Sequence, residues 1–231
     1  MAETKVISKR SIFIALTQFF FFLSLSKLSL IELVVLFSTG PLFIPIIEKV
    51  LYGSKISRPI ALTLLFSFFG VIVQSGVING IQFQWGMLLG LLAGFFNACS
   101  QVSMYKSSKI NLHPLMTNGV SFLIATLLVL PVVTLIIESP ASEYAYWLFP
   151  YVAVIVIMGG LSVGTQLFRT KAYQRSLSSA ELAPIFYLNI FIVALLQVIF
   201  FEQTFQLFQL LGLSIIVTAC LIYSYASYHL R

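Results

Sequence analysis

Long apolar runs separated by short polar breaks occupy nearly all of the 231 residues. A helix needs about 20 apolar residues to cross roughly 30 Å of hydrocarbon. Pairs such as Asn79-Gly80 and His113-Pro114 favour turns and mark the ends of runs. The pattern predicts an all-α, polytopic membrane protein with about eight transmembrane helices, at residues 11–26, 29–51, 59–77, 84–106, 114–137, 146–170, 180–201 and 205–228.

The composition excludes a soluble domain. Hydrophobic residues make up 59% of the chain and charged residues only 9%, and the mean hydropathy is +1.02. Soluble domains carry about 25% charged residues, because water must solvate their surfaces. A chain this poor in charge cannot cover a water-facing surface, so its surroundings must be largely lipid.

The positive charges lie in short clusters between the apolar runs. If the N-terminus is inside, 12 of the 13 Lys and Arg residues fall on the inner side and only Lys27 falls outside. The positive-inside rule then places both termini in the cytoplasm, and the short loops fit a bacterial inner membrane. Nucleic-acid binding is not expected, since it requires cations gathered on one surface. The run 11–26 lacks a signal-peptidase site, so we expect a retained helix.

A shift of 149 residues aligns the chain with itself. Residues 28–37 then lie on residues 177–186, with five of the ten positions identical. The same shift aligns the first three predicted helices with the last three, which cross the membrane in the opposite direction. We therefore predict a first, incomplete repeat of three helices at 1–77 and a second repeat of five helices at 84–228. Inverted repeats are typical of secondary transporters, whose substrate site lies between the halves.

This organisation resembles the drug/metabolite transporter superfamily, and within it the EamA-like transporter family. The second repeat carries Glu202 ten residues before Gly212, followed by the small Ala219. Gly86 and Gly90, which follow a polar loop, resemble the opening helix of the family's second repeat. The resemblance implies two inverted five-helix repeats and transport of small metabolites.

The first repeat departs from the family pattern. Pro41, thirteen residues before Ser54, occupies the position of the family's proline, but Ser54 stands where an acidic residue is usual. Asn189 and Ile190 stand where a second proline is expected. The first two family helices have no counterpart, which is consistent with either a misassigned start or a true truncation. The DNA upstream of the start codon would decide between them.

Small residues recur every fourth position at the start of the second repeat, at Gly86, Gly90, Gly94 and Ala98. Residues four apart lie on one face of a helix, so these four form a ridge of small side chains. In lipid such a ridge lets another helix approach closely. We interpret it as a packing surface.

Amide and phenol side chains within the spans are the candidates for substrate binding. Asn97 lies about 20° around the helix from Gly86, and Gln101 lies one turn further on the same side. Amides inside a membrane bind substrates or tie helices together, and both interpretations apply here. Further candidates are Gln18, Gln166, Tyr187 and Asn189. Because we expect no buried acid in the bundle, these residues suggest a polar solute that is not strongly cationic.

Charged residues near the ends of spans allow two interpretations each. Glu32 and Glu181, which the 149-residue shift superposes, would favour a helix dipole in a first turn. The alternative is proton coupling, because a desolvated carboxylate can titrate near neutrality. Arg169, Lys171 and Arg175 are expected to be topology charges at the interface, with capture of an anionic substrate as the alternative.

No arrangement of residues indicates catalysis. His113 and His229 lie in polar ends, the chain contains no Asp, and no phosphate-binding loop occurs. Cys99 and Cys220 lie within apolar runs without metal-ligand spacing, so we expect them to pack as small hydrophobic residues. We expect no enzyme, cofactor or metal. The sequence favours a secondary transporter or exporter of small polar metabolites, with a small-molecule substrate and the lipid bilayer as partners; the alternative is a truncated, non-transporting membrane fragment or structural partner.

Overall fold

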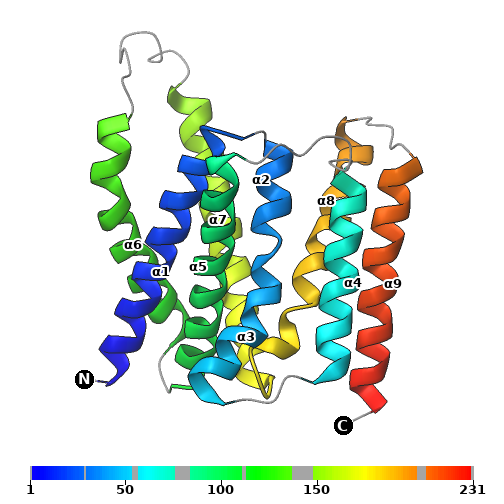
Figure 1. The fold of residues 1–231 in the computed structure, drawn as a ribbon. Helices are drawn as coiled ribbons and strands as arrows, with labels where there is room; N and C mark the ends of the chain where they lie inside the picture. Colours follow the sequence, from blue (N-terminus) through cyan, green and yellow to red (C-terminus); the bar gives the residue numbers. More distant parts are fainter. Residues whose placement is uncertain are drawn as a thin grey trace.

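A computed structural model of the chain describes residues 2–28, 30–53, 57–75, 84–110, 113–136, 148–201 and 207–229. Within these residues every regular element is a helix. The elements are α1 (Ala2–Leu25), α2 (Leu30–Phe37), α3 (Gly40–Tyr52), α4 (Arg58–Ser75), α5 (Trp85–Ser108), α6 (Pro114–Ile136), α7 (Leu148–Arg175), the 3-10 turn η3 (Ala180–Leu182), α8 (Ile185–Phe201) and α9 (Leu207–His229). They run alongside one another as a bundle, with both ends of the chain at the same end of it (Figure 1).

The described helices fit a protein that spans a membrane. Five stretches are long and apolar enough to cross it, in α1, α2–α3, α5, α6 and α7, and shorter apolar helices lie in α4, η3–α8 and α9. Each of the eight predicted runs has a helical counterpart, so the predicted all-α polytopic class is confirmed. The first helix differs in extent, because it begins at Ala2 rather than at residue 11. The basic residues of the N-terminus therefore lie on a helix rather than ahead of it.

One run predicted as a single helix is two helices, because the chain breaks between α2 and α3 at Ser38 and Thr39. Pro41 follows the break; it has no N–H and disfavours helical geometry in the residue before it. The Leu42 N–H donates to the Thr39 carbonyl at 2.9 Å, which leaves the Ser38 carbonyl without this partner. The Tyr187 hydroxyl donates to the Ser38 carbonyl at 2.8 Å and satisfies it inside the bundle.

The run predicted as one helix at 180–201 is also interrupted. The turn η3 is separated from α8 by Ala183 and Pro184, because Pro184 has no N–H to continue the ladder. The Pro184 carbonyl accepts hydrogen bonds from the Tyr187 N–H at 3.1 Å and from the Cys220 thiol at 3.3 Å. The two interrupted segments, α2–α3 and η3–α8, are those that the 149-residue shift superposes. The division into two inverted repeats stays a prediction.

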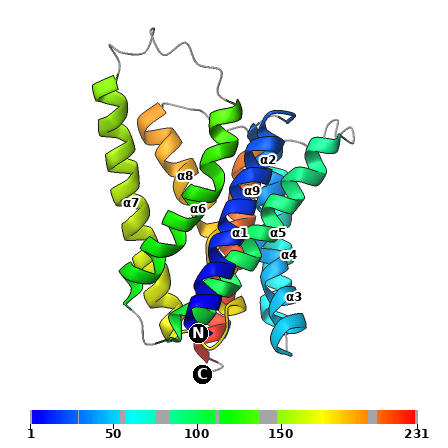
Figure 2. The same cartoon turned by 90° about the vertical axis from the view of Figure 1, so that its left-hand side faces the viewer.

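The ridge of small residues on α5 packs against α1 and α2. A Cβ atom at Gly86 would lie 2.8 Å from Leu28 Cγ, and one at Gly94 would lie 2.9 Å from Thr39 Oγ1. Separations this short leave no room for a side chain, so the packing role of the ridge is confirmed. Figure 2 shows α1 between α5 and α6, both of which it contacts.

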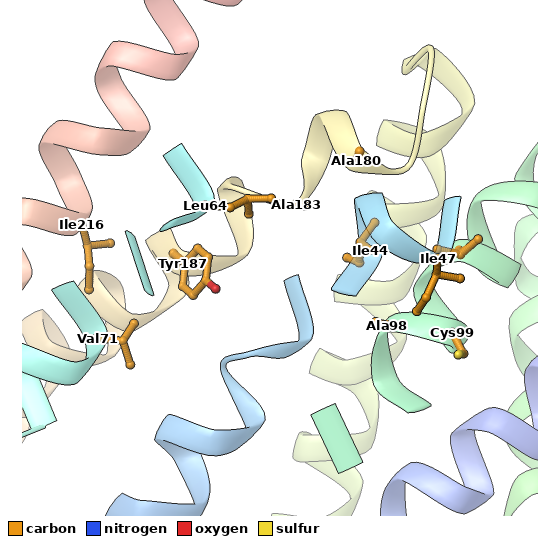
Figure 3. Close-up of a cluster of buried hydrophobic side chains, with 11 residues drawn as sticks. Ile44, Ile47, Leu64, Val71, Ala98, Cys99, Ala180, Ala183, Tyr187 and Ile216 are labelled. Carbon is orange, nitrogen blue, oxygen red and sulfur yellow. The ribbon is translucent and has the colours of Figure 1, made fainter. Parts of the chain in front are cut away.

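The main hydrophobic cluster joins α3, α4, α5, α8 and α9. Figure 3 shows Tyr187 beside Val71 and Ile216 in one part of the cluster, and Ile47 near Cys99 in another. Cys99 is buried in this cluster as a free thiol, which confirms its interpretation as a packing residue. The cluster holds the two broken segments in place around the bundle centre.

Candidate functional site

A cavity of about 120 Å³ lies among α1, α2, α5, α6 and α7. Its charged and amide-bearing lining residues are Arg10, Gln18, Asn97, Gln101, Gln166 and Arg169. Four of the six predicted substrate-binding residues are among them, the amides of α1, α5 and α7. The lining therefore combines helices from the first predicted repeat with helices from the second. A substrate role for these four residues stays a prediction.

The cavity extends from mid-depth toward the inner end of the bundle. Asn97 lies twelve residues into α5, about 18 Å along its axis and near its middle. Arg10 lies eight residues into α1, about 12 Å from its start. Arg169 lies six residues before the end of α7, about 9 Å from it. The amides are thus placed deepest, and the two arginines lie closer to the end that carries both termini.

One face of α1 forms a wall of the cavity. Arg10, Ile14, Thr17 and Gln18 share a helical stripe, because they are spaced by four, three and one residues. The Arg10 side chain is only 2% exposed, whereas Gln18 is exposed at the rim. Arg10 lies just before the helix predicted at 11–26, where only a topology charge was expected. Because α1 begins at Ala2, nine residues before that predicted start, it also carries Arg10 into the bundle.

Asn97 and Gln101 lie one turn apart on α5 and belong to a hydrogen-bond relay that reaches α7. The Tyr173 hydroxyl donates to Gln101 Oε1 at 3.4 Å, and Gln101 Nε2 donates to Asn97 Oδ1 at 3.5 Å. These distances are long for hydrogen bonds, so the relay orients the amides more than it stabilises the fold. Gln101 is therefore an interhelical tie as well as a lining residue. The relay leaves Asn97 Nδ2 as a donor with no hydrogen bond to any described residue.

Gln166 and Arg169 are three residues apart on α7 and so lie on one face of that helix. The Arg169 guanidinium lies 5.1 Å from the centre of the Phe186 ring, a distance at which a cation is attracted to an aromatic face. Lys171 and Arg175 are exposed on other faces of α7. The structure thus separates Arg169, which lines the cavity, from the two neighbours that the sequence grouped with it.

The two arginines give the cavity a positive charge, and no described residue of the lining carries a negative charge to offset it. The ionisable groups that act on Arg10 are Arg169, which repels it, and Tyr173. Among the described residues, Arg10 Nε and Gln166 Oε1 are buried without hydrogen-bond partners. A buried charge that lacks a partner costs several kcal/mol, and a buried acceptor that lacks a donor also costs free energy. The cavity therefore favours a ligand that supplies a negative charge and a donor.

Tyr187 and Asn189 do not line this cavity. Tyr187 is 1% exposed, and its hydroxyl is engaged by the Ser38 carbonyl as described above. Asn189 lies two residues further along α8 and is exposed. The structure therefore does not bring these two predicted residues together with the four amides.

Glu32 and Glu181 also lie away from the lining. Glu32 is in the first turn of α2. Glu181 Oε2 accepts the Leu177 N–H at 2.8 Å, while the Ser178 hydroxyl accepts the Glu181 N–H at 3.2 Å. This reciprocal pattern resembles a capping box, which stabilises the start of a helical turn. Proton coupling by either carboxylate stays a prediction.

Glu48 is a buried acid that the sequence analysis did not single out. It is 4% exposed, and its carboxylate accepts hydrogen bonds from Ser179 N at 3.1 Å, Ser179 Oγ at 2.9 Å and Ala180 N at 2.9 Å. A carboxylate at the start of a helical turn satisfies N–H groups that have no helical partner. The expectation of no buried acid was therefore wrong, although Glu48 does not line the cavity. The signal was an acid inside an apolar run, beside Lys49.

Further polar contacts join α5 to the segment after α7 at the same end of the bundle. The Tyr105 hydroxyl donates to the Leu177 carbonyl at 2.6 Å. Lys109 Nζ donates to the carbonyls of Gln174 at 3.0 Å and Ser176 at 2.7 Å. Together with Glu48, these contacts hold α3 and α5 against the connection from α7 to η3, near the end where the chain begins and ends (Figure 1).

Comparisons with known proteins agree with this architecture. The family model of the EamA-like transporter family matches residues 84–225. Twenty-six chains of solved structures are similar to this one. One of them, named only "Crystal structure of protein", has a TM-score of 0.77 and 17% identity, over 98% of this chain and 78% of that one. At this identity the likeness concerns the fold alone. No curated protein matches the sequence.

Proposed function

We propose that the protein moves small polar metabolites, such as amino acids or related solutes, by alternating access. The chain belongs to the EamA-like transporter family and is thus a membrane transporter of the drug/metabolite type. The observation that carries the proposal is the polar cavity between α1–α2 and α5–α7. Secondary transporters bind their substrates at such a place, between two inverted repeats. The proposed location is the inner membrane, with both termini in the cytoplasm.

Alternating access requires one end of the cavity to close while the other opens. The contacts of Glu48, Tyr105 and Lys109 are suited to closing the inner end. The breaks at Ser38 and Pro184 supply points at which α2–α3 and η3–α8 can bend, since few residues absorb the motion in a hinge. We expect the inner contacts to separate when the cavity opens toward the cytoplasm.

Transport by purified protein in proteoliposomes tests the proposal directly. The solutes are amino acids, nucleosides and small organic acids, offered for uptake and for counterflow. Asn97→Leu should reduce transport at least tenfold, because it removes an amide that lines the cavity, and should leave thermal stability near that of the wild type. Gln174→Leu changes an exposed amide outside the cavity and serves as the matched control. Absence of transport by well-folded protein for every class of solute would contradict the proposal.

A non-transporting membrane protein is the second candidate, and one observation favours it. Every residue of α7 from Val152 to Val163 is exposed, so this half of the helix contributes nothing to the described core. A transporter that rocks two halves needs both to be packed as rigid units. If Asn97→Leu lowers stability and the wild type moves no solute, this second candidate replaces the first.

A further inference from the structure

The charge of the cavity points to a class of substrate narrower than polar metabolites. Arg10 is almost completely buried, and Arg169 lines the same small space. None of the described carboxylates lines that space, and the buried Glu48 is held by the start of η3 elsewhere. Two like charges in a poorly solvated site repel each other, and each lacks an ion-pair partner in the described part of the chain. One anion between them would offset both costs.

We propose that the substrate is a small hydroxylated organic anion, whose carboxylate or phosphate group lies between Arg10 and Arg169 and whose hydroxyl donates to Gln166. This rests on the proposed function, in which the cavity is the transport site. Guanidinium groups present planar sets of donors that match the oxygens of carboxylates and phosphates. Asn97 adds a neutral amide deeper in the cavity.

The acceptor side of the cavity distinguishes a hydroxyl from an ammonium group. Gln166 Oε1 is buried and lacks a donor among the described residues, so a ligand hydroxyl would satisfy it. An ammonium group could also donate to this oxygen, but it would enter beside two guanidinium groups with no lining carboxylate to offset it. The cavity therefore favours hydroxy acids and hydroxylated phosphate esters over zwitterionic amino acids.

Size favours a free solute over a lipid headgroup as the source of the anion. The cavity of about 120 Å³ is small beside the pockets of roughly 300–1,000 Å³ that take drug-sized ligands. It is therefore suited to a small acid. A phosphate in a lipid headgroup offers the same oxygens but brings two acyl chains, which cannot follow it to the buried Arg10.

The binding experiment uses a matched three-carbon series on the full chain in phosphatidylcholine nanodiscs. Glycerate carries both a carboxylate and hydroxyls, glycerol lacks the anion, and serine replaces one hydroxyl by ammonium. Glycerate and glycerol 3-phosphate should raise the melting temperature in a saturable way, whereas glycerol and serine should not. An equal effect of serine or glycerol, or no effect of either anion, overturns the proposal. If added phosphatidylglycerol stabilises the protein and abolishes the glycerate effect, the site belongs to a lipid and the proposal also falls.

Variants separate recognition from folding. Arg10→Gln and Arg169→Gln should each weaken glycerate binding about tenfold or more, as expected for loss of a charged hydrogen bond. Lys171→Gln removes an equal charge from an exposed position of the same helix and should change binding little. Without ligand, Arg10→Gln should leave the melting temperature unchanged or raise it, because it removes a buried charge. A purely structural arginine would give a lower melting temperature instead.

A negative charge introduced into the cavity gives a second, independent test of the anion site. Gln166→Glu supplies the missing carboxylate, so it should raise the melting temperature of the empty protein and abolish the glycerate effect. If Gln166→Glu binds glycerate as the wild type does, the two arginines do not form the anion site. Counterflow with the same compounds distinguishes the two proposals. If the protein binds glycerate but does not transport it, the proposed transport function is wrong and the anion site stands. If it transports serine or glycerol but does not transport glycerate, the transport function stands and the anion site is wrong.

Discussion

Replacement of Glu48 by alanine removes the acceptor of three hydrogen bonds at the inner end of the bundle. The lost partners are the N–H and hydroxyl of Ser179 and the N–H of Ala180, at 2.9–3.1 Å. Hydrogen bonds to a charged group contribute about 1.5–3 kcal/mol each. The three share one carboxylate and the hydroxyl can turn to another acceptor, so the sum is smaller than three full bonds. We expect the free energy of unfolding to fall by about 3–4 kcal/mol.

The assay is unfolding of the purified protein by SDS in mixed micelles, followed by far-UV circular dichroism. Lys49→Ala is the matched control, because it removes the neighbouring, exposed side chain of the same helix and should change stability by less than about 0.5 kcal/mol. Ser179→Ala should cost about 1 kcal/mol, since it removes one of the three donors. The double variant should lose less than the sum of the two, because the Glu48–Ser179 bond is counted in both.

Two results would refute this reasoning about Glu48. If Glu48→Ala unfolds within about 0.5 kcal/mol of the wild type, the carboxylate does not hold η3 against α3. If Glu48→Ala and Ser179→Ala are strictly additive, the two residues act separately and their short contact contributes nothing. Either result would also remove the support that this contact gives to closure of the inner end.

Three further changes test the packing and the topology. Gly94→Leu should lower the free energy of unfolding by more than about 2 kcal/mol, because a Cβ there would meet Thr39 at 2.9 Å. Gly160→Leu, with open space around it, should have little effect, and similar losses in the two variants would contradict the packing argument. Tyr187→Phe should cost about 1 kcal/mol in the same unfolding assay, since it strands a helix-break carbonyl, and no loss would mean that the carbonyl finds another partner. Reporter fusions should place Lys109 inside and Glu143 outside, and finding both on one side would remove α6 as a span.

The helical runs could be predicted from the sequence because a bilayer imposes a simple length on them. About 20 apolar residues are needed whatever the packing, so hydropathy alone locates the spans. The breaks at Ser38-Thr39 and Ala183-Pro184 lie inside runs that are apolar on average, so a hydropathy window of about 20 residues spans them. Pro41 and Pro184 were visible as residues that disfavour a helix, but a proline often only kinks a membrane helix. The partners that stabilise a break, here the Tyr187 hydroxyl, come from distant segments.

Part of the candidate site could also be predicted, because polar residues stand out inside apolar runs. Amides inside an apolar run are conspicuous, and Gln18, Asn97, Gln101 and Gln166 do line one cavity. Tyr187 was conspicuous in the same way but bonds to a backbone carbonyl instead. A polar residue in a span must find a partner, and the sequence does not show whether that partner is a substrate or another helix.

The two arginines of the cavity show what the positive-inside rule cannot distinguish. The positive-inside rule uses only the position of a cation along the chain, and Arg169, Lys171 and Arg175 are equivalent on that measure. Around a helix they differ, since each residue turns about 100°. Arg169 then lies about 60° from Gln166, while Lys171 lies about 160° from Arg169 and Arg175 about 120° from it. A cation that shares a helix face with an amide inside a span is therefore a candidate for the site. The same test places Arg10, about 80° from Gln18, on the cavity face of α1.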